Sequence, residues 1–206
     1  MKQKVYKTVQ PIRSKKDREK LSNYFRSKNL RDYALFEFGI KVGRRISDLV
    51  KLNVEDVTYL DERGRFCMSE RLIIQEQKTG KFSTLYINEI AQRALSKYLK
   101  QRIKFTPLED LMTQPLFKSR KHGSNGECRL GSIQAWRILN NAAQACGLNY
   151  KIGTHSLRKT FGYVLYRQGV SIELIQKIFN HSSQDITLAY IGIMQDDIDK
   201  ALREMR

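Results

Sequence analysis

The sequence predicts an α+β fold that is mostly helical, with a small three-stranded antiparallel sheet at its edge. Three observations indicate this class. Apolar residues recur at helical spacing from Asp17 to Val50, short β-favouring runs fill roughly residues 57–87, and helical periodicity returns at Glu89 and dominates the rest of the chain. This order of elements predicts helices grouped around one small sheet.

The first 50 residues are expected to form an arm and three helices. Residues 1 to about 15 are predicted to be an extended basic arm that ends around Pro11, with Ser14 as the N-cap of the following helix. Breaks in the periodicity near Asn29 and at Gly43 divide the next stretch into two helices and a short third.

Three short runs in the middle of the chain are predicted to form the sheet. They read RFCMS, RLIIQEQ and FSTLYI, with turn-forming segments at 61–64 and 78–81. Beyond them, helices are expected from Glu89 to about Arg102 and from Ser132 to Cys146, with a polar loop from Lys118 to Gly131 between them. The remaining chain is expected to be helical with short connections.

Length and cysteine usage predict one domain in a reducing compartment. Residues 16–206 are expected to form a single domain behind the arm, without a separate N-terminal domain, because no Pro/Gly-rich break divides them. Cys67, Cys128 and Cys146 lack the spacing of a disulfide framework or a zinc site, so no metal or cofactor is expected. The basic N-terminus has no apolar signal-peptide core, which predicts a cytoplasmic protein.

The charge balance predicts a polyanionic partner. The chain carries 38 Lys and Arg against 21 Asp and Glu, a formal net charge of +17, which exceeds what solubility requires of a small domain. Nucleic acid is favoured over a membrane surface because no stretch is apolar enough to span a bilayer and no basic amphipathic segment carries lipid-facing aromatics. A basic surface that binds only water and ions is the alternative.

The stretch Thr154-His155-Ser156-Leu157-Arg158 opens a predicted helix. Thr154 is expected to be its N-cap. His155 and Arg158 are three residues apart, so their side chains are neighbours close to the helix N-terminus, which attracts anions. This pair suits a phosphate, although an HxxR pair taken alone is also common on surfaces without a special role.

A second group of polar residues follows, Asn180-His181-Ser182-Ser183, then Thr187 and Tyr190. A tyrosine at the end of a short amphipathic helix is ordinarily a core or rim residue. The context changes this expectation, because an arginine stretch at 43–49, a lysine in a β-turn, HSLR, NHSS and TxxY occur in one order over about 150 residues, and the joint pattern is specific where each piece is not.

In this joint pattern the sequence resembles the catalytic domain of the tyrosine recombinases, the family of phage integrases and Xer-type recombinases, from about Asn29 to Met194. The family's G-x-R-x-S-[DE]-L stretch matches Gly43 to Leu49, which makes Arg45 the matched arginine and Arg44 an expected solvated or DNA-facing neighbour. Lys81 is a weaker alternative to Lys78 in the hairpin turn. The resemblance implies six site residues: Arg45, Lys78, His155, Arg158, His181 and Tyr190.

Three features depart from the family pattern. Asn180 stands where a glycine is usual, the strand after the hairpin lacks the usual proline at 85–87, and the N-terminal DNA-clamping domain is missing. The last departure predicts a minimal, catalytic-domain-only recombinase, though a truncated chain would look the same.

The resemblance implies a specific chemistry. Tyr190 attacks a DNA phosphodiester that Arg45 and Arg158 hold, Lys78 donates a proton to the leaving 5′ oxygen, and the two histidines accept the tyrosine proton or bind the phosphate. A 3′-phosphotyrosyl bond results, and it keeps the energy of the broken bond, so neither ATP nor a metal ion is required. Such a protein exchanges strands of double-stranded DNA, for example in the integration of a mobile element, and is expected at the nucleoid.

The segment from Met194 to Met205 has an apolar stripe of Met194, Ile198, Ala201, Leu202 and Met205, with Asp196 and Asp197 in its first turn. It covers either its own core or, as the resemblance implies, a neighbouring protomer in a DNA-bound tetramer. Two other functions remain open at this point: a type IB topoisomerase-like enzyme that relaxes DNA, and a DNA-binding regulator of the same fold without catalysis.

Overall fold

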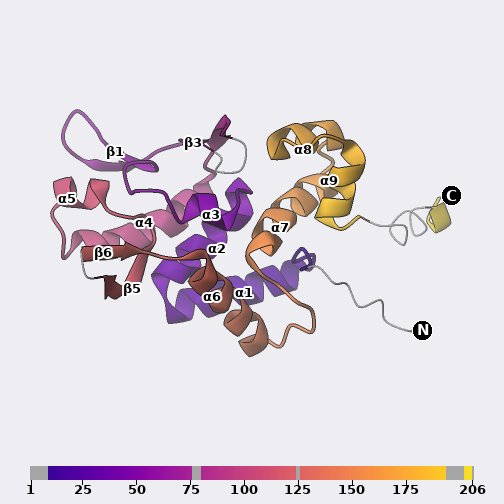
Figure 1. The fold of residues 1–206 in the computed structure, drawn as a ribbon, viewed down its shortest axis with the longest axis horizontal. Helices are drawn as coiled ribbons and strands as arrows, with labels where there is room; N and C mark the ends of the chain where they lie inside the picture. Colours follow the sequence, from indigo (N-terminus) through magenta and orange to yellow (C-terminus); the bar gives the residue numbers. More distant parts are fainter. Residues whose placement is uncertain (1–8, 76–79, 124–125, 194–201, 206) are drawn as a thin grey trace.

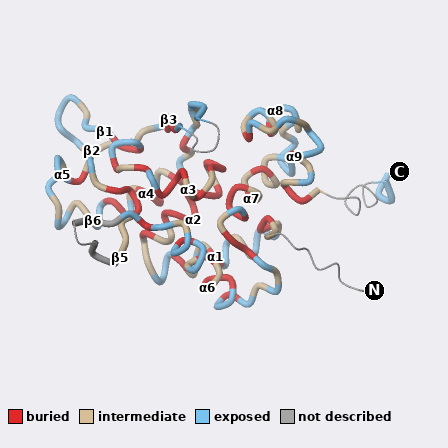
Figure 2. The backbone as a smooth tube through the Cα atoms, in the orientation of Figure 1, coloured by how far each residue is buried: buried red, intermediate tan, exposed pale blue. Residues whose placement is uncertain are grey.

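Helix α2 (Leu30–Val42) lies at the centre of the computed structural model, which describes residues 9–75, 80–123, 126–193 and 202–205 (Figure 1). It contacts α1 (Lys15–Lys28), α4 (Glu89–Ile103) and α7 (Thr154–Arg167) and is buried along nearly its whole length. A helix that is apolar on most faces must be covered on most faces. Figure 2 shows the resulting concentration of buried backbone in α2, α3 and the inner side of α7.

The first three helices confirm the predicted breaks. Ser14 caps α1 by accepting a hydrogen bond from the Asp17 amide, and Asn29 ends α1 and caps α2. Gly43 ends α2 in the left-handed region, at φ 63°, and a Cβ at this position would collide with the Phe161 ring. The short helix α3 (Ile46–Leu49) begins directly after this turn.

The mostly helical α+β class is confirmed, but the predicted three-stranded sheet is wrong in its pairing. Within the described residues, β1 (Thr58–Leu60) pairs with β2 (Phe66–Met68), and β3 (Arg71–Gln75) pairs separately with β4 (Phe82–Tyr86). A two-residue hairpin between β2 and β3 would need residues with positive φ, and neither Ser69 nor Glu70 has one. The chain therefore passes from one ladder into the next through a bend at Glu70, without a tight hairpin turn.

The predicted polar loop from Lys118 to Gly131 is also wrong, because β5 (Lys118–Gly123) and β6 (Gly126–Arg129) form an antiparallel ladder there. The segment lacks the apolar alternation by which strands are recognised in a sequence. Helix α5 (Leu108–Thr113) precedes it and α6 (Ser132–Ala145) follows, the latter with the predicted bounds to within one residue. Figure 1 shows α5, β5 and β6 at the end of the molecule opposite α8 and α9.

Helices α7, α8 (Ile172–Phe179) and α9 (Gln184–Ile191) share a small second core built on Ile175, Phe179 and Ile191. Helix α7 begins at Thr154 with Gly153 as its N-cap, so the predicted cap is displaced by one residue. The Gly153 amide donates to the Ser156 hydroxyl at 3.0 Å, which is the half of a capping box that satisfies the amide of the N-cap residue. This second core positions the C-terminal helices on α7.

The described part of the predicted arm packs against the body of the protein. Pro11 and Ile12 are buried, and the Ile12 amide donates to the Thr160 hydroxyl on α7. Residues 1–8 lie outside the described residues. Across the part of the chain that is described, no helix combines the length and the apolar character that crossing a membrane requires.

Candidate active site

Arg158 joins three segments that are far apart in the sequence. Its guanidinium, in a residue that is 1% exposed, donates to the Gly43 carbonyl at 2.8 Å and to the Phe179 carbonyl at 2.9 Å. Gly43 ends α2 just before Arg45, and Phe179 ends α8 just before Asn180 and His181. One buried arginine therefore fixes the segments that carry two other predicted site residues, because buried carbonyls and a buried charge satisfy one another.

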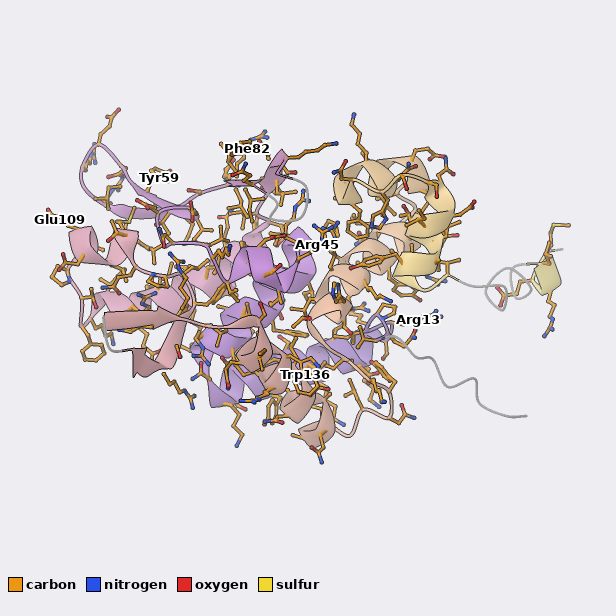
Figure 3. The ribbon with its side chains drawn as sticks, in the orientation of Figure 1. Arg13, Arg45, Tyr59, Phe82, Glu109 and Trp136 are labelled. Carbon is orange, nitrogen blue, oxygen red and sulfur yellow. The ribbon has the colours of Figure 1, made fainter. Side chains whose placement is uncertain are left out.

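Arg45 lies at the start of α3 and is half-buried, on the side of α3 that faces α7 (Figure 3). The expectation for Arg44 is wrong: it is 2% exposed and is neither solvated nor positioned on the surface. Asp48, four residues later and of opposite charge, is 3% exposed. Because α2 ends at Gly43 and turns sharply, consecutive arginines face in different directions, one into the protein and one toward α7.

Three side chains surround the Tyr190 ring. Phe179 and His181 meet it edge-on, with ring centres 5.6 Å and 5.1 Å away, and the ammonium of Lys159 lies 5.3 Å from the ring centre. These arrangements are favourable because the edge of one ring, or a cation, faces the negative face of another. The sequence motifs did not identify Lys159, since nothing but its position beside Arg158 connects it to a tyrosine 31 residues later.

Charge and burial act on the Tyr190 phenol in opposite directions. Burial raises the pKa of the phenol above its ordinary value, while the positive charges of Arg158 and Arg45 and a hydrogen bond with Arg158 act to lower it. The Nδ1 atom of His155 lies 3.4 Å from the phenol oxygen, a long hydrogen bond. The phenol is thus held in its protonated form beside two guanidinium groups and an imidazole.

The imidazole of His181 is oriented by Thr187. Its Nδ1 lies 3.1 Å from the Thr187 hydroxyl, which in turn lies 3.0 Å from the Ser183 carbonyl. A hydroxyl has one proton, so Thr187 donates to Ser183 and accepts from Nδ1–H of His181. With the proton on Nδ1, the neutral imidazole carries its lone pair on Nε2.

The structure explains why Asn180 stands where the family usually has glycine. Asn180 ends α8 with φ 54° and ψ 43°, and it is the one non-glycine residue with positive φ in the described chain. Asparagine tolerates this left-handed conformation better than other residues with a Cβ. The chain therefore turns toward His181 as a glycine would allow.

Five of the six predicted site residues gather at the meeting point of α2–α3, α7 and the α8–α9 pair: Arg45, His155, Arg158, His181 and Tyr190. Lys78 lies outside the described residues. Lys81, the weaker alternative, is exposed and directly precedes β4. Among the described residues no group of His, Cys, Asp or Glu side chains has the arrangement of a metal site.

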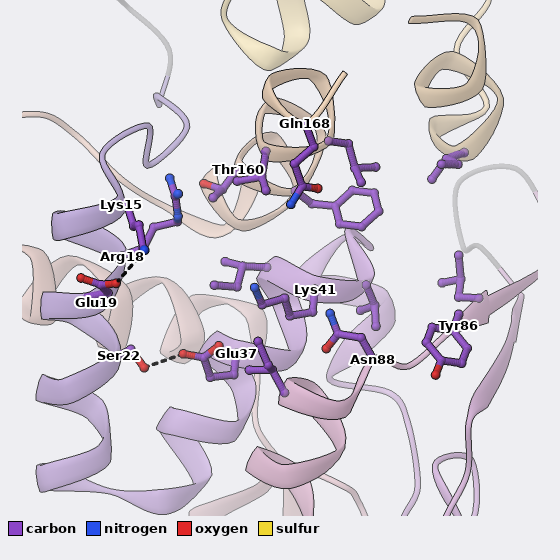
Figure 4. A pocket seen from close by; sticks show the side chains of 18 of the residues that line it. Lys15, Arg18, Glu19, Ser22, Glu37, Lys41, Tyr86, Asn88, Thr160 and Gln168 are labelled. Carbon is purple, nitrogen blue, oxygen red and sulfur yellow. Dashed lines mark hydrogen bonds and ion pairs between the residues drawn. The ribbon is translucent and has the colours of Figure 1, made fainter. Parts of the chain in front are cut away.

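A cavity of about 920 Å³ lies between α1, α2, the end of β4 and α7 (Figure 4). Its lining combines apolar and charged side chains. The apolar members include Ile40, Val42, Phe161, Val164, Leu165 and Ile178, and the basic members are Lys15, Arg18 and Lys41. Glu19 and Glu37 are the acidic members.

The sequence is similar to those of known recombinases. The chain is 41% identical over 188 residues to the probable integrase/recombinase YoeC of Bacillus subtilis, and the aligned region covers 91% of this chain and 92% of that protein. It is 32% identical over 165 residues to the tyrosine recombinase XerC of Thermodesulfovibrio yellowstonii, and the aligned region covers 79% of this chain and 50% of that protein.

Solved structures share the fold. The crystal structure of XerA recombinase superimposes with a TM-score of 0.71 at 21% identity, over 98% of this chain and 66% of that one. The post-cleavage complex of the XerH site-specific recombinase with a palindromic difH substrate gives a TM-score of 0.69 at 17% identity, over 97% of this chain and 54% of that one. The chain thus spans nearly all of YoeC but only between half and about two thirds of these Xer recombinases.

The resemblance inferred from the sequence motifs is confirmed by the extent of these matches. Residues 14–195 match the model of the phage integrase family, and the Bacillus relative matches over nearly its whole length. The chain belongs to the phage integrase family, the tyrosine recombinases.

Proposed function

We propose that this protein is a site-specific DNA recombinase or integrase that cuts and rejoins DNA strands through a 3′-phosphotyrosine intermediate. The observation that carries the proposal is the position of the Tyr190 phenol, which lies close enough to Arg158 and Arg45 for both charges to act on its pKa. A pair of arginines near a phenol suits a phosphodiester, because each guanidinium can bind one of the two non-bridging oxygens.

In the proposed reaction, the phenol oxygen of Tyr190 forms a bond to phosphorus and the bond from phosphorus to the 5′ oxygen breaks. Arg45 and Arg158 stabilise the negative charge that grows on the non-bridging oxygens, and each such donor contributes about 10² to 10³ in rate. His155, 3.4 Å from the phenol oxygen, accepts the phenol proton. His181 binds the phosphate through Nε2, with Thr187 holding its ring.

The leaving 5′ oxygen needs a proton, and Lys78 is the proposed donor, with Lys81 as the alternative. The reaction is proposed to need no metal ion or other cofactor, because arginine carries its charge at every physiological pH and supplies the electrostatic stabilisation itself. It is also proposed to need no ATP. The phosphotyrosine bond is a phosphodiester like the one that is broken, so a free 5′ hydroxyl of another strand reverses the step.

The test is formation of a covalent adduct on DNA that carries a nick beside the cleavage site. Target duplexes are first selected from a random library by retention on the protein after denaturation, with EDTA present and ATP absent. We expect wild type to give a slower-migrating adduct on denaturing gels and Tyr190→Phe to give none. Tyr166→Phe, on the exposed side of α7, is the matched control and should react as wild type.

Other outcomes distinguish the alternatives. Relaxation of any supercoiled plasmid without preference for the selected site would favour a type IB topoisomerase-like enzyme. Tight, site-specific binding with no adduct from wild type would favour a regulator without catalysis. An adduct that persists in Tyr190→Phe would rule out the assigned nucleophile.

Double-stranded DNA is the proposed partner, and the net charge of +17 supports it. Residues 1–8 of the basic arm are proposed to contact phosphates, and the protein is proposed to act in the cytoplasm at the nucleoid. Binding should weaken steeply as salt rises, because each neutralised phosphate releases counterions. Filter binding at several salt concentrations measures this slope.

We further propose that copies assemble on DNA, as a tetramer, through the C-terminal segment from residue 194. The cavity between α2 and α7 supports this proposal, because its apolar lining offers a surface for the apolar stripe of Met194, Ile198, Ala201, Leu202 and Met205. Its basic members Lys15, Arg18 and Lys41 match the acidic residues of the same segment. Deleting the residues after Gln195 should spare cleavage of a single strand and abolish paired recombination.

A second variant tests the cavity itself. Val164→Asp introduces a charge into the cavity lining, which includes none of the five described site residues. It should reproduce the phenotype of the deletion, with adduct formation retained and strand exchange lost. Equal loss of cleavage and exchange in the deletion would contradict the docking proposal.

A further inference from the structure

Residues 10–13 form a strap across the C-terminal helices. The Gln10 amide donates to the Lys151 carbonyl at 3.1 Å, and the Ile12 amide donates to the Thr160 hydroxyl at 2.8 Å. Ile12 is fully buried, so the strap is packed as well as hydrogen-bonded. Thr160 lies on α7, the helix that also carries His155 and Arg158.

Arg13 extends this strap to the helix of Tyr190. Its guanidinium donates to the carbonyl of Gly192 and lies 5.5 Å from the centre of the Tyr163 ring on α7. Gly192 is the C-cap of α9, two residues after Tyr190, with φ 83°. Figure 3 shows Arg13 where the N-terminal chain meets these helices.

Arg13 and Pro11 both pack closely against Gly192. A Cβ at Gly192 would come within 3.2 Å of the Arg13 Nη2 atom and within 3.3 Å of Pro11 Cδ. A guanidinium at a helix C-terminus is favourable, because the last carbonyls lack partners within the helix and carry the negative end of its dipole. Arg13 is this partner for the Gly192 carbonyl, although it lies 179 positions earlier in the sequence.

Helix α9 needs such an anchor. It has eight residues, and only Thr187 and Ile191 are buried. A helix of two turns is not stable by itself in water, so its orientation depends on tertiary contacts. Tyr190 lies in the last turn of α9, two residues before the carbonyl that Arg13 holds.

We propose that Arg13 is a positioning residue for the nucleophile: by clamping the C-terminal end of α9 onto α7, it keeps the Tyr190 phenol beside Arg158 and His155. This inference rests on the proposed function, in which Tyr190 attacks DNA. Arg13 acts through the backbone of Gly192 and need not touch the DNA.

The test compares Arg13→Gln and Arg13→Lys with a control of equal charge loss, Arg63→Gln, on the exposed turn between β1 and β2. The rate of adduct formation is measured in single turnovers on the nicked duplex, and the Kd for the same duplex is measured separately. Arg13→Gln should slow adduct formation about ten-fold or more with little change in Kd, because a small misplacement of a nucleophile is costly. Arg13→Lys should recover part of the rate, and Arg63→Gln should match wild type.

Amide hydrogen exchange provides a readout that does not need activity. In Arg13→Gln the peptide covering 184–192 should exchange faster than in wild type, while peptides of α2 and α4 exchange at the wild-type rate. A wild-type rate of adduct formation in Arg13→Gln, or unchanged exchange in α9, overturns the inference. Faster exchange throughout α2 and α4 also overturns it, because the residue would then stabilise the whole fold.

Failure of the proposed function gives a different result. Wild type would then form no adduct on any selected duplex, whatever residue stands at position 13. The exchange of α9 would still report whether Arg13 clamps the helix, so the two ideas are judged separately.

Discussion

The guanidinium of Arg158 lies over the ring of Phe179, 4.4 Å from its centre, and donates to the carbonyl of the same residue. Two interactions with one residue fix the last turn of α8 against α7. The ring of Phe179 also meets the ring of Tyr190 edge-on, so the same pair supports the proposed nucleophile. Arg158 therefore has a structural task in addition to its proposed contact with phosphate.

Replacing Arg158 by lysine should distinguish the role of the guanidinium's geometry from the role of its charge. Lysine keeps the charge but cannot reach both carbonyls, so we expect a loss of adduct formation of at least about 100-fold. Leaving buried carbonyls short of donors should also lower the free energy of unfolding by about 1–3 kcal/mol. Single-turnover cleavage and urea denaturation measure the two effects, with Arg167→Lys on the exposed end of α7 as the control. A variant that cleaves at the wild-type rate would contradict the role given to the guanidinium.

Lys159 should influence the proposed nucleophile through its contact with the Tyr190 ring. Its ammonium is 5.3 Å from the ring centre, and burial lowers the pKa of Lys159. A cation–π contact that is partly desolvated contributes about 1–2 kcal/mol, so Lys159→Met should slow adduct formation by roughly 5–30-fold. Lys159→Arg keeps the cation and should retain most of the rate. Equal rates in the methionine variant and wild type, at equal DNA affinity, would show that the contact has no part in the reaction.

Local patterns in the sequence predicted the parts of the fold that local interactions determine. The helix breaks at Asn29 and Gly43 are encoded by a capping side chain and by a residue that tolerates positive φ, and both lie where they were predicted. The family was identified from the motifs around Arg45, Arg158 and Tyr190, and the relatives confirm it. The roles of these residues stay predictions until adduct formation is tested.

Features that depend on distant contacts could not be predicted. Strand pairing was wrong because the runs of β-favouring residues do not say which strand is the partner, and β1 was not recognised. The burial of Arg44 depends on the turn at Gly43, which lies against the Phe161 ring of α7. Arg13 and Lys159 contact α9 across 179 and 31 positions, so no local pattern marks them.

Asn180 offers a test of backbone conformation close to His181. Asparagine and alanine both carry a Cβ, but the short polar side chain of asparagine can hydrogen-bond locally in the left-handed region at φ 54° and alanine cannot. Asn180→Ala should therefore lower the free energy of unfolding by about 1 kcal/mol, whereas Asn180→Gly should be nearly neutral. Adduct formation should fall in the alanine variant if the turn shifts His181, and stay unchanged in the glycine variant. Urea denaturation and single-turnover cleavage measure both. Similar stability of the two variants would contradict the conformational explanation.

The stability of the fold should decline at alkaline pH, in part through Tyr98. This residue is 6% exposed, and burial raises the pKa of its phenol above the ordinary value, against the opposing charge of Arg102. Between the pKa of the unfolded chain, about 10, and the higher folded pKa, the folded state holds a proton that the unfolded state has lost. The stability from this group is therefore complete below pH 10 and is lost above it, with a slope of up to about 1.4 kcal/mol per pH unit. Urea denaturation from pH 9 to 11 should show that stability declines less steeply in Tyr98→Phe than in wild type. The control Tyr59→Phe, at an exposed tyrosine, should decline with the wild-type slope. Parallel curves for all three proteins would contradict the assignment to Tyr98.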